Sequence, residues 1–223
     1  MSLHRCGETY CSNCKKFFLD KHFCFLKKIP PKDPSQKLIF FDFETDQNSG
    51  EHQVNFAMAM YNDGEELVFK GYDACDQFYK FLFSEKHKGF TAIAHNMRGF
   101  DGQFILAYLL KQGLKPKVIP NGSKVMKIEL PSCNIRIIDS FNFLPMSLAK
   151  LPITFGQDEL VKGFFPHLFN TQQNQNYIGK LPETSFYAPE YMSEGDTLKF
   201  FKWYEERKKE VFNFEEEITK YCR

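Results

Sequence analysis

The sequence predicts a three-layer domain of the α/β or α+β class, for three reasons. Apolar runs with the length of strands are mixed with segments of helical periodicity, and the strand-rich part comes first. The run Lys37–Phe43 is apolar almost throughout, as expected of a central strand that is covered on both faces. The 223 residues include 26 Phe against one Trp, which indicates a well-filled interior rather than disorder.

Two strands and a helix are expected after this first strand. Gln53–Tyr61 and Glu66–Lys70 are strand-like runs, and the Asn-Asp-Gly sequence at residues 62–64 is a good turn between them. Asp73–Lys86 follows with apolar side chains at helical spacing. The three segments therefore predict a hairpin followed by a helix.

Strands and helices then alternate up to residue 139. Phe90–His95 is a short apolar strand, and Asp101–Gly113 is a helix that its final glycine ends. Residues 117–130 predict a hairpin on an Asn-Gly turn, because both central residues of a type I′ turn need a positive φ. Asn134–Asp139 is a further strand.

The pattern dissolves from about Pro145 to Pro189, where Pro, Gly and polar residues dominate. A loop of this length is unusual unless it is functional or specific to a family. The tail is helical again. Ser193 resembles the first residue of a capping box ahead of a helix over Leu198–Phe212, and Asn213 caps a second helix.

Charge and hydropathy exclude several classes of protein. Lys and Arg number 29 against 28 Asp and Glu, so the chain is not a polycation and must bind any nucleic acid through a local groove. No apolar run approaches the length that spans a bilayer. The N-terminus carries Cys and charge where a signal peptide would be apolar, so an intracellular protein is expected, with nucleus and mitochondrion not distinguished.

The chain divides unevenly into a Cys-rich, basic segment with a Pro-rich linker, residues 1–36, and a larger domain, residues 37–223. Four of the seven Cys lie in the first 24 residues, which in a chain without an export signal indicates metal binding or thiols rather than disulfides.

This front segment is a candidate zinc site. Cys11, Cys14, His22 and Cys24 supply four ligands of the kind that a tetrahedral zinc ion needs. So small a segment cannot build its own core, so zinc would supply its folding energy. The alternative is a disordered basic arm with reduced thiols.

Two acids lie at the end of the first apolar strand. Asp42 and Glu44 are two residues apart, so on a strand their carboxylates point to the same face, roughly 6.5 Å apart. Such a pair repels unless cations neutralise it, and hard divalent ions prefer oxygen ligands. The alternative is a solvated strand end.

A third acid, Asp101, opens a helix directly after another apolar strand. It could simply be stabilised by the helix dipole. However, His95, Asn96 and Phe100 crowd the same turn, where Asn and His can hold a polar ligand and Phe can stack on a base.

These motifs together resemble the 3′–5′ exonuclease domain of family B DNA polymerases. Asp-Phe-Glu-Thr at residues 42–45 is followed by Asn-x-x-x-Phe-Asp at residues 96–101 and by a Tyr on a late helix. Residues 139–151, residues 162–170 and the tail Trp203–Tyr221 most resemble the protein-primed branch of viruses, organellar linear plasmids and self-synthesising transposons.

The resemblance covers about residues 37–223 and implies a ribonuclease-H-like α/β fold with a mixed central sheet. It implies hydrolysis of single-stranded DNA 3′ ends with two metal ions, Mg²⁺ or Mn²⁺, held by Asp42, Glu44 and Asp101. The implied DNA contacts are Thr45, His95, Asn96, Phe100, Ser147 and Leu148. Either Lys150 or Lys162 would support the scissile phosphate.

The resemblance breaks at the third motif of the family, Tyr-x-x-x-Asp. Tyr221 matches the Tyr that orients the attacking water, but the Asp would fall two residues past Arg223. Asp139, at a strand end, is only a weak replacement. The exonuclease activity of the chain is therefore in doubt, and the chain is interpreted as the front part of a polymerase, with the remaining polymerase region or a priming protein as partner.

Two other readings stay open. The chain could be a catalytically silent nucleic-acid-binding fragment, or a ribonuclease with the same kind of acidic site. Comparing RNA with DNA oligonucleotides would separate the last reading, because the 2′-hydroxyl distinguishes the two substrates.

Overall fold

The computed structural model describes residues 6–23, 35–97, 100–122, 124–156 and 163–223. The chain forms two compact units, Met1–Ser35 and Gln36–Arg223. In the first unit, strands β1 (Thr9–Cys11) and β2 (Lys16–Phe18) pair as an antiparallel hairpin.

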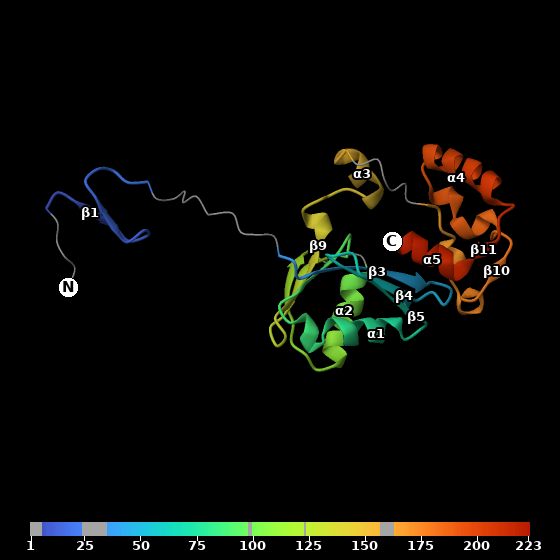
Figure 1. The fold of residues 1–223 in the computed structure, drawn as a ribbon, viewed down its shortest axis with the longest axis horizontal. Helices are drawn as coiled ribbons and strands as arrows, with labels where there is room; N and C mark the ends of the chain where they lie inside the picture. The colour runs from blue at the N-terminus through green and yellow to red at the C-terminus, as the bar shows by residue number, and fades with distance from the viewer. Residues whose placement is uncertain (1–5, 24–34, 98–99, 123, 157–162) are drawn as a thin grey trace. The chain divides into compact units, whose positions relative to one another are not determined.

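A seven-stranded sheet forms the centre of the second unit, with strand order β5-β4-β3-β6-β9-β8-β7 (Figure 1). The pairs β3–β6 and β6–β9 are parallel and the other pairs are antiparallel, so the sheet is mixed, as the resemblance implied. Its strands are β3 (Leu38–Asp46), β4 (Gln53–Tyr61), β5 (Glu66–Lys70), β6 (Thr91–Ala94), β7 (Lys117–Asn121), β8 (Lys124–Leu130) and β9 (Ile135–Asp139).

Helices α1 (Ala74–Leu82) and α2 (Asp101–Lys111) cover one face of this sheet (Figure 1). The main core lies between these helices and the sheet, because the apolar side chains of Ile39, Phe41 and Phe43 on β3 point to this face. Its fully buried members include Ile39, Phe78 and Leu109. The prediction of a layered α/β domain is confirmed.

A second, smaller core covers the opposite face of the sheet. There the even-numbered residues Phe56 and Met58 of β4 pack against helix α5 (Phe214–Cys222) and against the long irregular segment that precedes it. This segment contains the short helix α3 (Leu151–Thr154) and several single 3₁₀ turns. The predicted loop is therefore a folded layer of the domain, built largely from aromatic side chains.

A β-bulge interrupts the pairing of β3 with β4 beside the candidate acids. Glu44 pairs with Phe56 but Thr45 pairs with Val54, so Asn55 is an extra residue on β4. Its side chain is fully buried and exchanges two hydrogen bonds with the amide of Asn170, at 2.7 and 3.1 Å. The bulge thus joins the end of β3 to the irregular layer.

The end of the penultimate helix was predicted wrongly. Helix α4 spans Glu194–Arg207 and does not continue to Phe212, although Ser193 caps it as predicted. Phe212 and Asn213 form strand β11, which pairs with strand β10 (Ile178–Gly179). Pairing with a distant segment and burial of the Phe212 side chain therefore override the local helical pattern.

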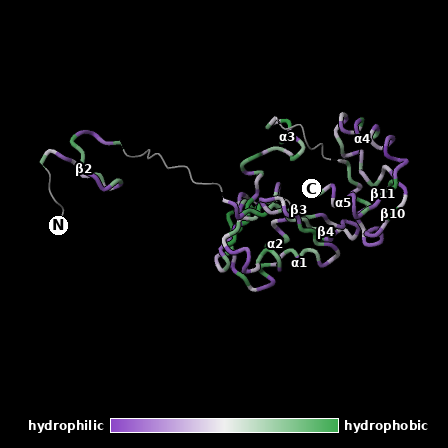
Figure 2. Tube along the Cα trace, viewed as in Figure 1, coloured by the Kyte–Doolittle hydropathy of each residue, from purple (hydrophilic) through white to green (hydrophobic). Residues whose placement is uncertain are grey.

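Hydropathy follows these layers along the chain. Figure 2 shows apolar stretches on β3, β4, α1 and α2, whereas α4 is largely hydrophilic and buries only Phe200. In the described part of the chain, no helix combines the length and the apolar character needed to cross a bilayer.

Candidate metal and nucleic-acid site

The parallel strands β3, β6 and β9 bring the candidate residues to one edge of the sheet. Phe40 pairs with Ile93, and Ala94 pairs with Asp139, so the carboxyl ends of the three strands meet. Ligand sites of α/β sheets lie at this end, because the loops that follow the strands converge there.

The first two acids lie on the sheet face that α5 covers. Asp42 pairs with Met58 and Glu44 with Phe56, opposite the face of the main core. Ligand atoms of Asp42, Glu44 and Cys222 all lie within 4.8 Å of one another. The Glu44 side chain is almost buried, so its charge is poorly solvated.

Asp101 joins this pair from the first turn of α2. Only 7% of the residue is exposed, and this burial raises the pKa of its carboxyl to about 8, with the negative charge of Asp42 as the next cause and those of Glu44 and Asp139 adding to it. We call Asp42, Glu44 and Asp101 the acidic cluster. A carboxyl with such a pKa is one that a cation would ionise.

Asp139 lies behind the acidic cluster and is fully buried. Its Oδ1 accepts hydrogen bonds from the backbone N–H groups of Asn96 and Phe141, both at 2.9 Å. Asn96 has a φ of 62°, which Asn tolerates better than most residues. Asn96 and Asp139 therefore fix the loop after β6 through the backbone, a role that the sequence did not reveal.

The donor set of the acidic cluster fits hard divalent cations. Carboxylate oxygens from two separate segments converge in a partly desolvated place, where their mutual repulsion is unfavourable unless positive charge is added. Asp42, Glu44 and Asp101 are therefore the residues that would hold Mg²⁺ or Mn²⁺. The thiol of Cys222 is a softer neighbour that donates to Glu44 Oε1 at 3.8 Å.

Tyr221 lies near the acidic cluster through its neighbours. Its ring stacks on Phe165 at a centroid distance of 5.1 Å and meets the edge of His167 at the same distance. His167 Nδ1 lies 3.5 Å from Glu44 Oε2. Sequence reasoning missed His167 and Cys222, although His167 belongs to the stretch 162–170 that carries part of the family resemblance.

A cleft of about 330 Å³ opens beside Asp42. Of the predicted DNA contacts, His95 and Leu148 line it, and Ser147 directly precedes Leu148. The His95 ring is fixed there, because Nε2 donates to the Met146 carbonyl at 2.8 Å and Nδ1 lies 3.0 Å from the Ser140 hydroxyl. The complete lining is Phe40, Phe41, Asp42, Met58, Met60, Glu66, Ile93, Ala94, His95, Ser140, Leu144, Leu148, Leu151, Cys222 and Arg223.

Thr45 and Phe100 meet through a residue that the sequence did not single out. Thr45 Oγ1 lies 3.1 Å from His52 Nδ1, and the His52 ring lies 4.5 Å from the ring of Phe100. Half of Phe100 is exposed, so its ring is available for stacking. Lys150 is exposed, and Lys162 lies outside the described residues.

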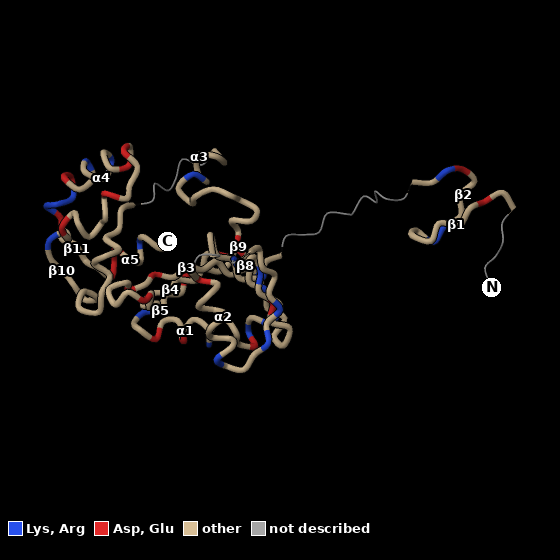
Figure 3. The backbone as a smooth tube through the Cα atoms, turned by 180° about the vertical axis from the view of Figure 1, so that it is seen from behind, with Lys and Arg blue, Asp and Glu red and all other residues tan. Residues whose placement is uncertain are grey.

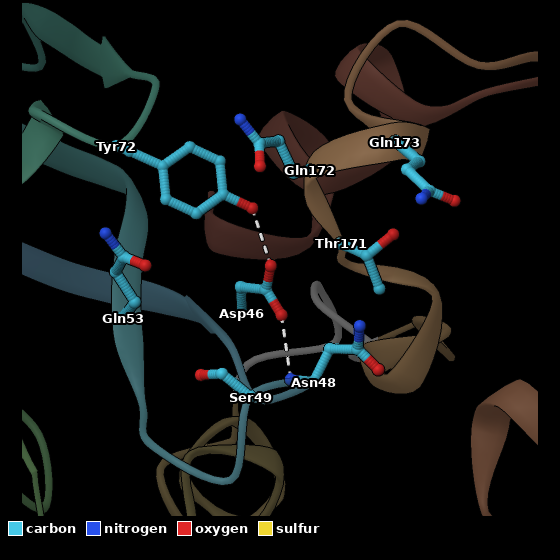
Figure 4. A pocket seen from close by; sticks show the side chains of 8 residues that line it. All are labelled: Asp46, Asn48, Ser49, Gln53, Tyr72, Thr171, Gln172 and Gln173. Atoms are coloured by element: carbon cyan, nitrogen blue, oxygen red, sulfur yellow. Dashed lines mark hydrogen bonds between the residues drawn. The ribbon is translucent and has the colours of Figure 1, made fainter.

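A polar pocket of about 260 Å³ lies at the end of β3, separate from the acidic cluster (Figure 4). Asp46 is committed there, because its Oδ2 accepts from the Tyr72 hydroxyl at 2.6 Å and its Oδ1 accepts from the Asn48 N–H. Asp46, the third acid of the Asp-x-Glu-x-Asp sequence, therefore belongs to the polar pocket and not to the acidic cluster.

Basic side chains lie along the β9-β8-β7 side of the sheet, where Figure 3 shows blue segments around β8. Lys117 and Lys124 are exposed on β7 and β8, and Arg136 is exposed on β9. Phosphate groups of a nucleic acid are the ligands that such charges attract.

In the first unit, the ligand atoms of Cys11, Cys14 and His22 also lie within 4.8 Å of one another. Cys24, the fourth predicted zinc ligand, lies outside the described residues.

Comparison with known proteins identifies relatives of the chain. Residues 84–223, more than half of it, match the family model for DNA polymerase type B, organellar and viral. A probable DNA polymerase of Agaricus bitorquis is 28% identical over 199 residues, which are 87% of this chain and 23% of that protein. A probable DNA polymerase of Ascobolus immersus is 29% identical over 222 residues, which are 91% of this chain and 18% of that protein. The chain thus spans about a fifth of the length of these curated relatives.

Solved structures show the same fold. Phi29 DNA polymerase, in its complex with primer-template DNA and incoming nucleotide substrates, superposes with a TM-score of 0.50 and 18% identity, over 69% of this chain and 28% of that one. The orthorhombic crystal form of Phi29 DNA polymerase superposes with a TM-score of 0.50 and 20% identity, over the same shares of the two chains. At this identity the likeness supports the fold alone.

Proposed function

The chain belongs to the organellar and viral type B DNA polymerases, and from this premise we propose that it carries a 3′–5′ exonuclease module that removes nucleotides from single-stranded DNA ends. The observation that carries the proposal is the closeness of Asp42 and Glu44, whose carboxylates lie within 4.8 Å of each other, with Asp42 lining the cleft. Asp101 is buried close enough to them for their negative charges to raise the pKa of its carboxyl. Three acids in a partly desolvated place have no evident structural purpose, since they repel one another.

Mg²⁺ or Mn²⁺ in the acidic cluster would supply an activated water and positive charge at the leaving oxygen of the phosphodiester. The protein's own part is to hold the carboxylates in place. Asp101 is fixed by the start of α2, and Asp42 and Glu44 by the ladder between β3 and β4. Such fixed positions cost no reorganisation during the reaction.

The DNA strand would lie along the cleft with its terminal nucleotide at Asp42. Leu148, Met60 and Leu144 offer apolar contacts to sugars and bases in this cleft. The exposed ring of Phe100 offers a stacking surface, which a base of any sequence can use. These contacts suit an enzyme that removes nucleotides without regard to sequence.

Tyr221 would orient the attacking water from α5. Its ring is held by Phe165 and His167, and His167 in turn approaches Glu44. The Tyr221 ring is therefore held beside His167, whose Nδ1 approaches the carboxylate of Glu44.

Digestion of a 3′-labelled single-stranded oligonucleotide in the presence of Mg²⁺ or Mn²⁺ tests the proposal. We expect Asp42→Ala and Asp101→Asn to reduce the rate by at least about 100-fold. Asp46→Asn is the matched control, because Asp46 lies on the same strand but outside the acidic cluster, and its rate should stay near that of the unaltered chain.

A version of the chain extended by two residues, the second of them Asp, supplies the remaining acid of the family's third motif. A faster rate for this version is expected. The exonuclease proposal is wrong if the extended chain is no more active than its own Asp42→Ala variant. Tight oligonucleotide binding without cleavage would then favour a silent binding module, and preference for RNA would favour a ribonuclease.

A further inference from the structure

We propose that the first unit binds a zinc ion through Cys11, Cys14 and His22. The proposal concerns a separate unit and does not depend on the exonuclease function. The Sγ atoms of the two cysteines and a ring nitrogen of His22 lie within 4.8 Å of one another. Cys14 Sγ and His22 Nε2 are 3.3 Å apart. In a tetrahedral site with Zn–S of about 2.3 Å and Zn–N of about 2.0 Å, ligand atoms lie roughly 3.5–3.8 Å apart, so little movement is needed.

The turn between the two strands presents both cysteines to one point. Cys11 ends β1 and Cys14 lies in the turn before β2. The Lys15 N–H donates to the Cys11 carbonyl at 2.8 Å, which closes the turn. Lys15 has a φ of 55°, a left-handed conformation that is unfavourable for a residue with a side chain. A bound ion would offset this cost, because the turn directs both sulfur atoms to it.

The ring of His22 is aimed at the same point by an aromatic neighbour. It stacks on Phe18 at a centroid distance of 3.5 Å with an interplanar angle of 8°. This contact fixes the ring plane and leaves Nε2 facing Cys14. A metal-binding His is usually oriented by a hydrogen bond from its other ring nitrogen, and here the stack on Phe18 orients the ring.

Burial in the unit gives the third argument. Among residues 6–23, its described part, none is buried, and even Phe17 and Phe18 are only half-buried. A two-stranded hairpin is marginally stable in water without further support. A zinc ion with thiolate and imidazole ligands supplies folding free energy to units of this size.

The donor chemistry selects the metal. Two thiolates and an imidazole favour Zn²⁺ over Mg²⁺ or Mn²⁺, which prefer oxygen. A disulfide between Cys11 and Cys14 is the competing use of these thiols, and it would leave the approach of His22 without a purpose.

Zinc titration of the reduced 223-residue chain tests the site, monitored by metal content and by the thiolate charge-transfer absorption of a Co²⁺ substitute. An Asp42→Ala/Glu44→Ala background removes the acidic cluster as a competing site. In that background we expect one equivalent of tightly bound zinc. Cys11→Ser/Cys14→Ser should weaken binding at least about 100-fold. The matched control Cys75→Ser/Cys222→Ser removes two thiols from the second unit and should leave the zinc affinity unchanged.

Replacement of His22 separates ligation from packing. His22→Cys should retain the ion and strengthen the charge-transfer band of its Co²⁺ form. His22→Phe preserves the stack on Phe18 but should no longer bind the ion. The proposal is overturned if the two double-Cys variants bind zinc equally, or if the reduced chain binds none in this background. These readouts do not involve nuclease activity, so the two proposals fail independently.

Discussion

Single residues at the carboxyl ends of the central strands show that both backbone and side-chain groups build the site. In the sequence, Asp139 looks like a fourth acid of the acidic cluster. It is fully buried, however, and its Oδ1 accepts hydrogen bonds from two backbone N–H groups. Asp101, by contrast, is buried among acids, and the pKa of its carboxyl rises to about 8. The first carboxylate organises a loop, and the second is poised for a cation.

The buried amide pair of Asn55 and Asn170 gives a prediction at this scale. Asn170 also donates to the Thr45 carbonyl at 3.1 Å, so Asn170→Ala should lower the free energy of unfolding by about 1–3 kcal/mol. Urea denaturation measures the change. The Asn55→Ala/Asn170→Ala double variant should lose less than the sum of the single variants, because the pair is shared. Strict additivity would show that the two amides act separately.

His87 predicts how the stability of the domain depends on pH. Its side chain is fully buried, its Nδ1 donates to the Phe81 carbonyl at 2.7 Å, and its Nε2 faces the Tyr61 hydroxyl. Burial lowers the pKa of this imidazole, so the unfolded chain takes up the proton more readily than the folded one.

The His87 contribution to stability is therefore fully present above the ordinary His pKa of about 6.5 and is lost as the pH falls below it. The slope should be at most about 1.4 kcal/mol per pH unit. Unfolding curves between pH 7.5 and 5.5 should show this loss, and His87→Gln should reduce it. An unchanged slope in the variant would assign the effect to other groups.

At the scale of the element, helix α5 links local capping to the candidate site. The Asn213 side chain accepts from the Glu215 N–H at 3.2 Å and donates to Glu216. Eight and nine residues further along, Tyr221 and Cys222 reach the surroundings of Glu44. The stability of one cap therefore affects the far end of the helix where the site lies.

Asn213→Ala should cost about 1 kcal/mol of helix stability and speed amide hydrogen exchange at Tyr221 and Cys222. Ser193→Ala is the matched control, since Ser193 caps α4 with the same 3.2 Å hydrogen bond. It should cost a similar free energy and leave the exchange of α5 unchanged. Equal exchange in the two variants would show that α5 is held by packing rather than by its cap.

The elements also show what the sequence could predict. The strands Gln53–Tyr61 and Glu66–Lys70 and the start of α2 at Asp101 follow from alternation and turn residues, and the structure has the same bounds. Strand β11 could not be predicted, because its partner β10 lies more than thirty residues away and is only two residues long.

The same limit applied to the site. Asp42 and Glu44 lie in a recognisable strand and Asp101 lies at a recognisable helix start, so motif and spacing could single them out. His52, His167 and Cys222 reach the site from a loop, a 3₁₀ turn and the far end of a helix. Their positions depend on how the irregular layer packs, which local patterns do not encode.

For the whole molecule, metal and stability should be coupled. The Mg²⁺ site proposed at the acidic cluster exists only in the folded chain, so Mg²⁺ should raise the midpoint of thermal unfolding. The gain at a hundredfold excess over the dissociation constant is about 2.7 kcal/mol. Asp101→Asn should stabilise the metal-free protein, since it removes a buried acid that repels its neighbours, and should abolish most of the Mg²⁺ effect.

Calorimetry with and without EDTA measures both effects. Asp46→Asn serves again as the control, and it should respond to Mg²⁺ as the unaltered chain does. A Mg²⁺ response that survives in Asp101→Asn would place the ion elsewhere in the molecule.

The strand order β4-β3-β6-β9 also has a consequence for how the domain matures. The hairpin of β3 and β4 can form as soon as it is synthesised, whereas the acidic cluster is complete only when β6 has paired with β3 and α2 has brought Asp101 to it. Pairings between remote segments are the slow steps of folding. Binding of a divalent ion should therefore occur later than strand formation. The ion would then bind only to chains that have completed the last stage of folding.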